Sequence, residues 1–155
     1  MTGVVQFLTP EGRGRLAAEL EFLQTVKRSE VAANLKSARD DADLNENAGY
    51  QELKREQAFV EGRIRELASI LANAQVLKAK GARDLVSLGA RVTVAEEGRD
   101  SETYQIVGWA EADPLAGRIS YESPVGAALL GRRVGDRVTV DAPGGVLHFE
   151  IIAIR

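Results

Sequence analysis

DDADLNENAGY, residues 40–50, interrupts a first half of the chain that otherwise favours helix. Its first seven residues carry four carboxylates, and Asn47 and Gly49 follow them. Asp and Asn favour caps and turns, and a glycine costs about 1 kcal/mol in a helix interior. The stretch therefore predicts an acidic turn that joins two helices.

Two apolar stripes flank this turn. The first helix is predicted to begin with Thr9 as N-cap and Pro10 as the first helical residue, and to end near Asp40. Its stripe consists of Leu16, Leu20, Leu23, Val31, Leu35 and Ala38. The second stripe consists of Leu53, Val60, Ile64, Leu67, Leu71 and Ala74, with Gln57 as its polar member. The stripes can bury each other in an antiparallel coiled coil with arms of roughly 30 residues, about 45 Å long. The alternative is a plain helical hairpin packed into a globule.

The second half of the chain has a different pattern, with short apolar runs of period two and many glycines. Strands are predicted at 89–94, 102–107, 118–121, 136–140 and 146–152, and a short helix at 124–130. The predicted fold class is α+β, with an antiparallel coiled-coil hairpin followed by a small antiparallel sheet domain. The predicted domains are residues 1–78, with the acidic tip near 40–50, a linker at 79–84, and residues 85–155.

Composition narrows the classes of function. With 45% apolar and only 5% aromatic residues, the 155-residue chain is expected to be globular with an aliphatic core. It has no cysteine, which excludes disulfides, thiolate metal sites and a cysteine nucleophile. No 18-residue apolar segment exists, so the default expectation is a cytoplasmic protein without membrane contact. Residues 1–78 carry 11 basic and 12 acidic side chains and the remainder 9 and 11, so no basic excess predicts a general duplex-binding surface.

Several residues that could do chemistry have simpler explanations. His148 alternates with apolar neighbours on a predicted strand, which favours a structural histidine over a catalytic or metal-binding one. Gly144 and Gly145 follow Pro143 as a hairpin turn, and no helix N-terminus follows that could make them a phosphate loop. Serines on the predicted helices have no histidine nearby, so no nucleophilic triad is expected.

The acidic turn allows two interpretations. An acidic run is often only a solvated surface. However, Asp43 and Glu46 are three residues apart, so their carboxylates can converge across a tight turn or a first helical turn. Paired carboxylates suit Mg²⁺, which usually takes one or two of them and completes its shell with water and phosphate oxygens. Such a site would need a second macromolecule to complete it.

Four ordered blocks of sequence resemble one family over essentially the whole chain. They are LTPEGRGRLAAELEFLQTVKRSEV, DLNENAGYQELKREQAFVEGRIREL, YQIVGWAEADPLAGRISYESPVGAALLG and VGDRVTVDAPGGVLHFEI. The chain resembles the GreA/GreB bacterial transcript cleavage factors. The resemblance implies an N-terminal coiled coil that enters the secondary channel of RNA polymerase and an FKBP-like C-terminal domain. It also implies a monomer that works one per polymerase, meets the extruded 3′ end of backtracked RNA and stimulates the polymerase's cleavage of an internal phosphodiester of that RNA.

The resemblance also assigns roles to residues. Asp43 and Glu46 match the two functional acids, which help the polymerase hold a second Mg²⁺ and orient the attacking water. No tight metal binding is expected in the free protein. Asn47 and Tyr50 would support the tip, and Arg39 and Lys54 would contact RNA or the polymerase. The segment Glu122, Ser123 and Pro124 matches a C-terminal patch that grips the polymerase near the channel rim.

Departures from the family pattern leave alternatives open. The tip reads A-D-L-N-E-N-A-G-Y where G-D-L-x-E-N-A-E-Y is commoner, and Arg28-Ser29-Glu30 stands where R-P-E is usual, which removes a proline kink. Asp40 and Asp41 add charge to the tip, and some Gre-like homologues with acid-rich tips occupy the same channel and inhibit transcription. A binding or folding module is suggested by the FKBP-like domain alone, and a plain coiled-coil adaptor is a further possibility.

Overall fold

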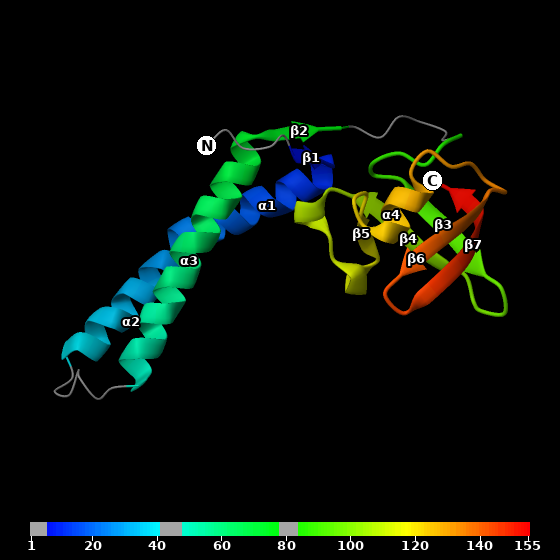
Figure 1. The fold of residues 1–155 in the computed structure, drawn as a ribbon. Coiled ribbons are helices and arrows are strands. Elements are labelled where there is room, and N and C mark those ends of the chain that lie inside the picture. Colours follow the sequence, from blue (N-terminus) through cyan, green and yellow to red (C-terminus); the bar gives the residue numbers. More distant parts are fainter. Residues whose placement is uncertain (1–5, 41–47, 78–83) are drawn as a thin grey trace. The chain divides into compact units, whose positions relative to one another are not determined.

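The computed structural model describes residues 6–40, 48–77 and 84–155. The chain divides into two compact units (Figure 1). One unit comprises Gly14–Asn73, and the other comprises Ala74–Arg155 together with the segment that ends at Arg13. The linker predicted at 79–84 falls almost entirely outside the described residues, so the predicted domain boundaries stay a prediction.

The helical unit is an antiparallel pair of long helical arms. The first arm consists of α1 (Pro10–Phe22), a π-helical segment η1 (Leu23–Lys27) and α2 (Arg28–Asp40), and the second arm is the single helix α3 (Ala48–Ala72). Figure 1 shows α2 and α3 running side by side, as their mutual contacts require. The predicted helical hairpin is confirmed. Its second stripe ends before Ala74, because that residue belongs to a strand.

The two stripes bury each other as the spacing predicts. Leu16, Leu23, Val31 and Leu35 of the first arm are buried, and so are Val60, Ile64 and Leu67 of the second. Ile70, which was not assigned to the stripe, is buried as well. Burying a side chain of this size contributes roughly 1.5–3 kcal/mol each, so this seam is the main source of stability for the pair of helices.

The spacing of apolar residues in the first stripe explains the π-helical segment. From Leu23 to Leu35 the stripe advances 12 residues, through Lys27 and Val31, in three successive steps of four. Twelve residues make about 3.3 turns of a regular α-helix, so Leu35 would lie about a third of a turn away from Leu23. The wider π turn, in which the N–H of Arg28 donates to the carbonyl of Leu23, takes up the extra residue. The first arm is therefore interrupted despite the missing proline.

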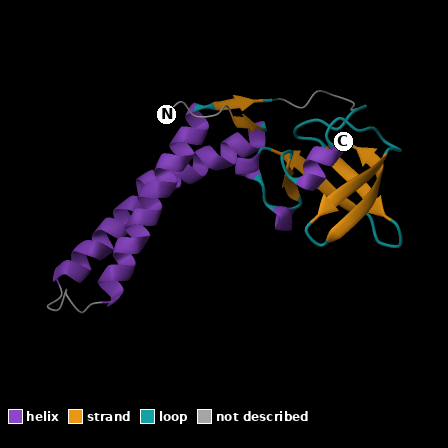
Figure 2. Ribbon diagram, in the orientation of Figure 1, coloured by secondary structure: helices purple, strands orange, loops and turns teal. Residues whose placement is uncertain are grey.

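The C-terminal unit holds a five-stranded sheet in the order β5-β4-β3-β7-β6 (Figure 2). Its strands are β3 (Arg91–Glu96), β4 (Glu102–Val107), β5 (Arg118–Ser120), β6 (Arg137–Ala142) and β7 (Gly145–Ile154). Helix α4 (Pro124–Leu129) and two short 3₁₀ turns, η3 (Trp109–Glu111) and η4 (Pro114–Ala116), connect them. All predicted strands and the short helix are confirmed within two residues at each end. The α+β class is confirmed, and one feature was missed: β4 and β5 pair in parallel.

A second, smaller sheet was also missed. Strand β1 (Gln6–Leu8) pairs in parallel with β2 (Ala74–Val76). Strand β1 precedes α1 and β2 follows α3, and both strands belong to the C-terminal unit. Strands of three residues are too short to show a period in the sequence.

The core of the C-terminal unit is aliphatic, as the composition predicts. It is built from Val92, Val94, Ile106, Leu129, Val138, Val140 and Ile151 with their neighbours, and Phe149 is the aromatic member of this buried cluster. Within the described residues, no helix is long and apolar enough to cross a membrane.

Candidate functional site

The predicted tip lies between the ends of α2 and α3. Asp43, Glu46 and Asn47, together with Asp41, lie outside the described residues. The described structure reaches the tip from both sides, because α2 ends at Asp40 and α3 begins at Ala48. The seven residues between these ends include both predicted functional acids.

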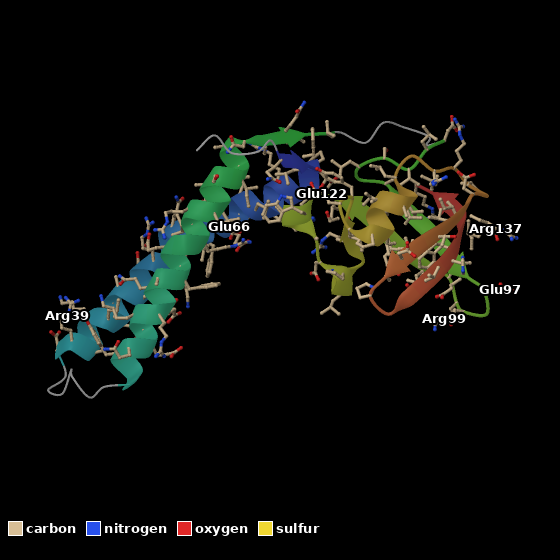
Figure 3. The ribbon with its side chains drawn as sticks, in the orientation of Figure 1. Arg39, Glu66, Glu97, Arg99, Glu122 and Arg137 are labelled. Atoms are coloured by element: carbon tan, nitrogen blue, oxygen red, sulfur yellow. The ribbon has the colours of Figure 1, made fainter. Side chains whose placement is uncertain are left out.

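The predicted basic contacts lie on the two helices beside the tip. Arg39 is exposed in the last turn of α2, where Figure 3 shows its side chain at the end of the helix. Lys54 is exposed on the second turn of α3, and Tyr50 is half-buried in the first. A cation in a last turn also stabilises its own helix through the helix dipole. Arg39 and Lys54 are both exposed, and their contact with RNA or the polymerase stays a prediction.

Ion pairs hold the two arms in register away from the tip. The Arg63 guanidinium lies 2.7 Å from a carboxylate oxygen of Glu19, and the Arg28 guanidinium lies 2.8 Å from Glu61. Both contacts use two guanidinium nitrogens, with second distances of 3.0 Å. A third cross-pair joins Lys27 to Glu56 at 2.8 Å. Sequence reasoning missed these pairs, although opposite charges at facing positions of the predicted hairpin could have indicated them.

These contacts shift the pKa values of the charged groups. The hydrogen bond to Glu56 raises the pKa of Lys27, and the hydrogen bond to Glu19 raises that of Arg63. Conversely, the hydrogen bond from Arg28 lowers the pKa of Glu61 below its ordinary value. Lys27 stands at a stripe position between Leu23 and Val31, so its pair with Glu56 explains a charged side chain in a mainly apolar seam.

The predicted C-terminal patch forms the start of α4. Glu122 and Pro124 are exposed, whereas Ser123 is half-buried and caps the helix. The Ser123 hydroxyl accepts from the Gly126 amide at 3.1 Å and donates to the Ser120 carbonyl at 2.6 Å. Ser123 therefore has a structural role of its own, and Glu122 and Pro124 are the members of the patch that face outward.

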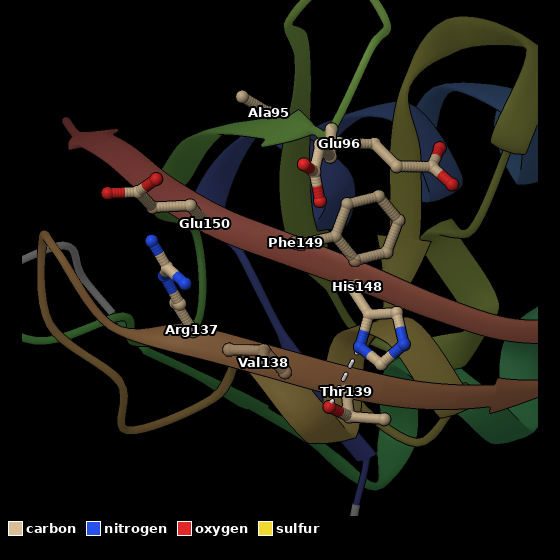
Figure 4. A pocket seen from close by; sticks show the side chains of 9 residues that line it. Ala95, Glu96, Arg137, Val138, Thr139, His148, Phe149 and Glu150 are labelled. Carbon is tan, nitrogen blue, oxygen red and sulfur yellow. Dashed lines mark hydrogen bonds between the residues drawn. The ribbon is translucent and has the colours of Figure 1, made fainter.

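An open groove of about 540 Å³ lies on the sheet of the C-terminal unit (Figure 4). Its lining includes Glu96, Arg137, His148, Phe149 and Glu150. His148 is exposed and lies 3.2 Å from the Thr139 hydroxyl through its Nδ1 atom. Figure 4 shows the side chains of Arg137 and Glu150 facing each other across neighbouring strands. Four charged side chains and a single phenyl ring, that of Phe149, line this groove, so it gives no support to the aromatic-lined pocket that a prolyl isomerase needs.

The described residues also limit where a metal could bind. Among them, no group of three or more His, Cys, Asp or Glu side chains could hold a metal ion. The proposed Mg²⁺ ligands Asp43 and Glu46 are outside this set, so their role stays a prediction.

Comparison with known proteins places both halves of the chain in one family. Residues 6–76 match the family model "Transcription elongation factor, N-terminal", and residues 80–155 match "Transcription elongation factor, GreA/GreB, C-term". A relative from Thermoanaerobacter pseudethanolicus, named transcription elongation factor GreA, is 51% identical over 150 residues, covering 96% of each chain. Its namesake from Chloroflexus aggregans is 46% identical over 157 residues, covering 100% of each chain.

A solved structure is similar as well. The GreA factor homolog 1 protein of Thermus thermophilus is 33% identical, with 98% of this chain and 99% of that chain covered and a TM-score of 0.46. The family assignment rests on the sequence matches, which span nearly the whole length of this chain and of its relatives. This chain belongs to the GreA/GreB family of transcription elongation factors.

Proposed function

We propose that this protein binds bacterial RNA polymerase, inserts its helical hairpin into the secondary channel and stimulates the polymerase's own cleavage of backtracked RNA. One observation carries the proposal. The helices α2 and α3 are antiparallel, and they end and begin at Asp40 and Ala48, so the segment with Asp43 and Glu46 joins them at one end of the pair.

The helical pair suits the task of carrying a group to a distant site. Helix α3 has 25 residues and is therefore about 38 Å long. Buried side chains along the seam and the cross-pairs Glu19–Arg63 and Arg28–Glu61 resist sliding of one arm along the other. An arm that kept no fixed register would deliver its tip to a variable position, and a loss of about 1 Å in positioning can cost a hundredfold in rate.

The donor set at the tip fits Mg²⁺. Asp43 and Glu46 offer carboxylate oxygens, and Mg²⁺ commonly takes one or two of these while water and phosphate oxygens fill its other positions. A second Mg²⁺ bound in the polymerase active site supplies Lewis acidity, which lowers the pKa of water and stabilises charge on the attacking and leaving oxygens. In this proposal the two carboxylates would help to hold the second Mg²⁺ and to orient the attacking water, and the polymerase would supply the remaining ligands of the metal. The protein is then a cofactor for cleavage and no nuclease on its own.

The remaining predicted residues divide between the tip and the C-terminal unit. Asn47 and Tyr50 would support the tip, and Arg39 and Lys54 would contact the RNA 3′ end or the channel wall. Glu122 and Pro124 would contact the polymerase near the channel rim, because they are exposed at the start of α4. One copy of the chain would act on each polymerase.

The test uses backtracked elongation complexes of purified polymerase with the full-length protein. We expect Mg²⁺-dependent shortening of the RNA, which Asp43→Asn and Glu46→Gln abolish without weakening binding. Asp40→Asn is the matched control, because it removes the same charge three residues away from Asp43. Binding is followed by the electrophoretic shift of the complex.

The same assay decides between stimulation and inhibition. The acid-rich tip, with Asp40 and Asp41 beside the predicted pair, is the observation that keeps an inhibitor as the second candidate. Slower nucleotide addition without RNA shortening would support the inhibitor. Absence of polymerase binding would contradict both.

A further inference from the structure

A buried carboxylate in the C-terminal unit holds the first turn of the coiled-coil helix. Glu111 is only 6% exposed, and Thr9 is only 1% exposed. One oxygen of the Glu111 carboxylate accepts from the Thr9 amide at 3.0 Å and from the Gly108 amide at 3.2 Å. The other oxygen accepts from the Thr9 hydroxyl. Hydrogen bonds from amides and hydroxyls to a buried carboxylate are among the stronger ones in proteins.

The same threonine caps the helix. The Thr9 hydroxyl accepts from the Gly12 amide at 3.1 Å, which confirms the predicted N-cap. A continuous chain of hydrogen bonds thus runs from Glu111 through Thr9 to Gly12. We call these three residues, with Gly108, the clasp. The contact joins positions 102 apart in the chain.

Two glycines leave space for the clasp. A Cβ atom on Gly12 would lie 1.6 Å from the Glu111 carboxylate oxygen, and one on Gly108 would lie 2.1 Å from the Phe7 carbonyl oxygen. Such distances are impossible, so any side chain at either position would displace the carboxylate or the strand. Gly14 lies two residues after Gly12 in the same helix, and among the described residues no atom beyond its chain neighbours and the backbone of its own helix lies within 4 Å of its would-be Cβ. The requirement for glycine at position 12 therefore comes from the clasp and not from helix α1.

Neighbouring contacts hold the strand that leads into the helix. Leu8 is fully buried, and its carbonyl accepts from the Leu77 amide at 3.0 Å. The ring of Phe7 meets Tyr121 edge-on, with centroids 6.4 Å apart. Residues 6–13 thus belong to the C-terminal unit, and α1 leaves that unit after Arg13.

We propose that Glu111 is a positioning residue for the proposed stimulation of RNA cleavage. It fixes the point at which α1 leaves the C-terminal unit, and the same helical arm ends at the tip that carries Asp43 and Glu46. The inference rests on the proposed function. If the C-terminal unit binds the polymerase and the tip completes its active site, a loosened clasp should impair delivery of the tip more than binding.

The experiment compares Gly12→Ala with Gly14→Ala in the backtracked-complex assay, with the concentration of factor varied. Gly12→Ala should lower the maximal rate of RNA shortening roughly ten- to a hundredfold, because small errors in positioning have effects of this size. The concentration for half-maximal effect should stay nearly unchanged. Gly14→Ala should match the wild type in both quantities.

A second pair of variants covers the case in which Gly12→Ala does not fold, as judged by circular dichroism. Glu111→Gln keeps the shape and one acceptor oxygen, whereas Glu111→Ala removes the clasp. We expect the maximal rate to fall in the order wild type, Glu111→Gln, Glu111→Ala, at similar half-maximal concentrations. Hydrogen exchange of the Gly12 amide should accelerate in the same order.

The outcomes separate the two proposals. Equal maximal rates for wild type and folded Glu111→Ala would overturn the positioning role and leave the proposed function intact. A rise in the half-maximal concentration without change in the maximal rate would also overturn it, since that result indicates binding. If the wild type itself shortens no RNA, the proposed function fails, and the positioning role fails with it.

Discussion

The guanidinium of Arg63 grips the carboxylate of Glu19 through two nitrogens, at 2.7 and 3.0 Å, across the two arms of the helical unit. Arg63 also lies 2.8 Å from Glu66, one turn further along its own helix. The arginine is about one quarter exposed, so water screens the contact only partly. This fork joins α1 to α3 and favours the register in which the apolar seam is buried.

The first prediction concerns this register. A double-mutant cycle of Glu19→Ala and Arg63→Ala should give a coupling free energy of unfolding of about 0.5–1 kcal/mol, near the top of the range for surface ion pairs. The coupling should decrease at high salt. Urea denaturation measures it, and Glu52 with Arg55 gives a matched cycle, because that pair lies within one helix and is about three quarters exposed. A larger coupling for the exposed pair would contradict the prediction.

The second prediction concerns pH. Arg28 lowers the pKa of Glu61, whose ordinary value is 4.5. The stability that this pair contributes is therefore fully present above pH 4.5 and is lost as the pH falls through the lower folded-state pKa. Thermal unfolding of wild type and Glu61→Gln should differ at pH 7 and converge once the pH is below the folded-state pKa of Glu61. If the stability difference between wild type and Glu61→Gln grew as the pH fell, the pKa of Glu61 would be raised in the folded state and not lowered.

The third prediction separates two glycines of one helix. Gly14→Ala should raise the free energy of unfolding by up to about 1 kcal/mol, since alanine is the better helix former and the site is open. Gly12→Ala should lower it, because the new Cβ would overlap the Glu111 carboxylate. Chemical denaturation of both variants tests this, and equal shifts would mean that Gly12 is no more constrained than Gly14.

The fourth prediction concerns the start of α4. Ser123→Ala should destabilise the C-terminal unit by about 0.5–2 kcal/mol through loss of the cap, whereas Ser123→Thr keeps a hydroxyl that can make both hydrogen bonds. Weakened polymerase binding in Ser123→Ala could thus come either from the loss of stability or from the loss of a direct contact with the polymerase. Glu122→Gln removes the charge of an exposed carboxylate that also interacts with Tyr121, so its effect on binding tests the patch itself once thermal unfolding shows unchanged stability.

The parts of the fold that could be predicted from the sequence are those with local periodicity. Apolar spacing predicts both helical arms and all five strands of the main sheet, and Thr9-Pro10 predicts the helix start. The π segment was missed, although three successive four-residue steps from Leu23 to Leu35 carry its signal. Strands β1 and β2 and the parallel pairing of β4 with β5 depend on contacts between distant segments, which no local period encodes.

The residues of the candidate sites also divide into those with a local sequence pattern and those without one. The acidic tip stands out in the sequence because a turn rich in carboxylates conflicts with the helices around it, whereas the role of Asp43 and Glu46 comes from the family resemblance and stays a prediction. Glu111 could not, since a single glutamate in a short 3₁₀ turn has no pattern, and its partner Thr9 is 102 positions away. The local cue was a glycine at position 12 inside a helix, which is costly unless something close to the backbone requires it.

The facing charges of the two arms also limit how this family member can change in length. A deletion in α2 alone would leave Lys27 with Glu56 and Glu19 with Arg63 in place, but it would leave an unmatched stretch of α3 beside the tip. Removing seven residues from each arm, on the tip side of Arg28 and Glu56, would keep the three cross-pairs Glu19–Arg63, Lys27–Glu56 and Arg28–Glu61 and shorten the reach by about 10 Å. Evolution or engineering can therefore alter the reach of the tip only through matched changes in both helices.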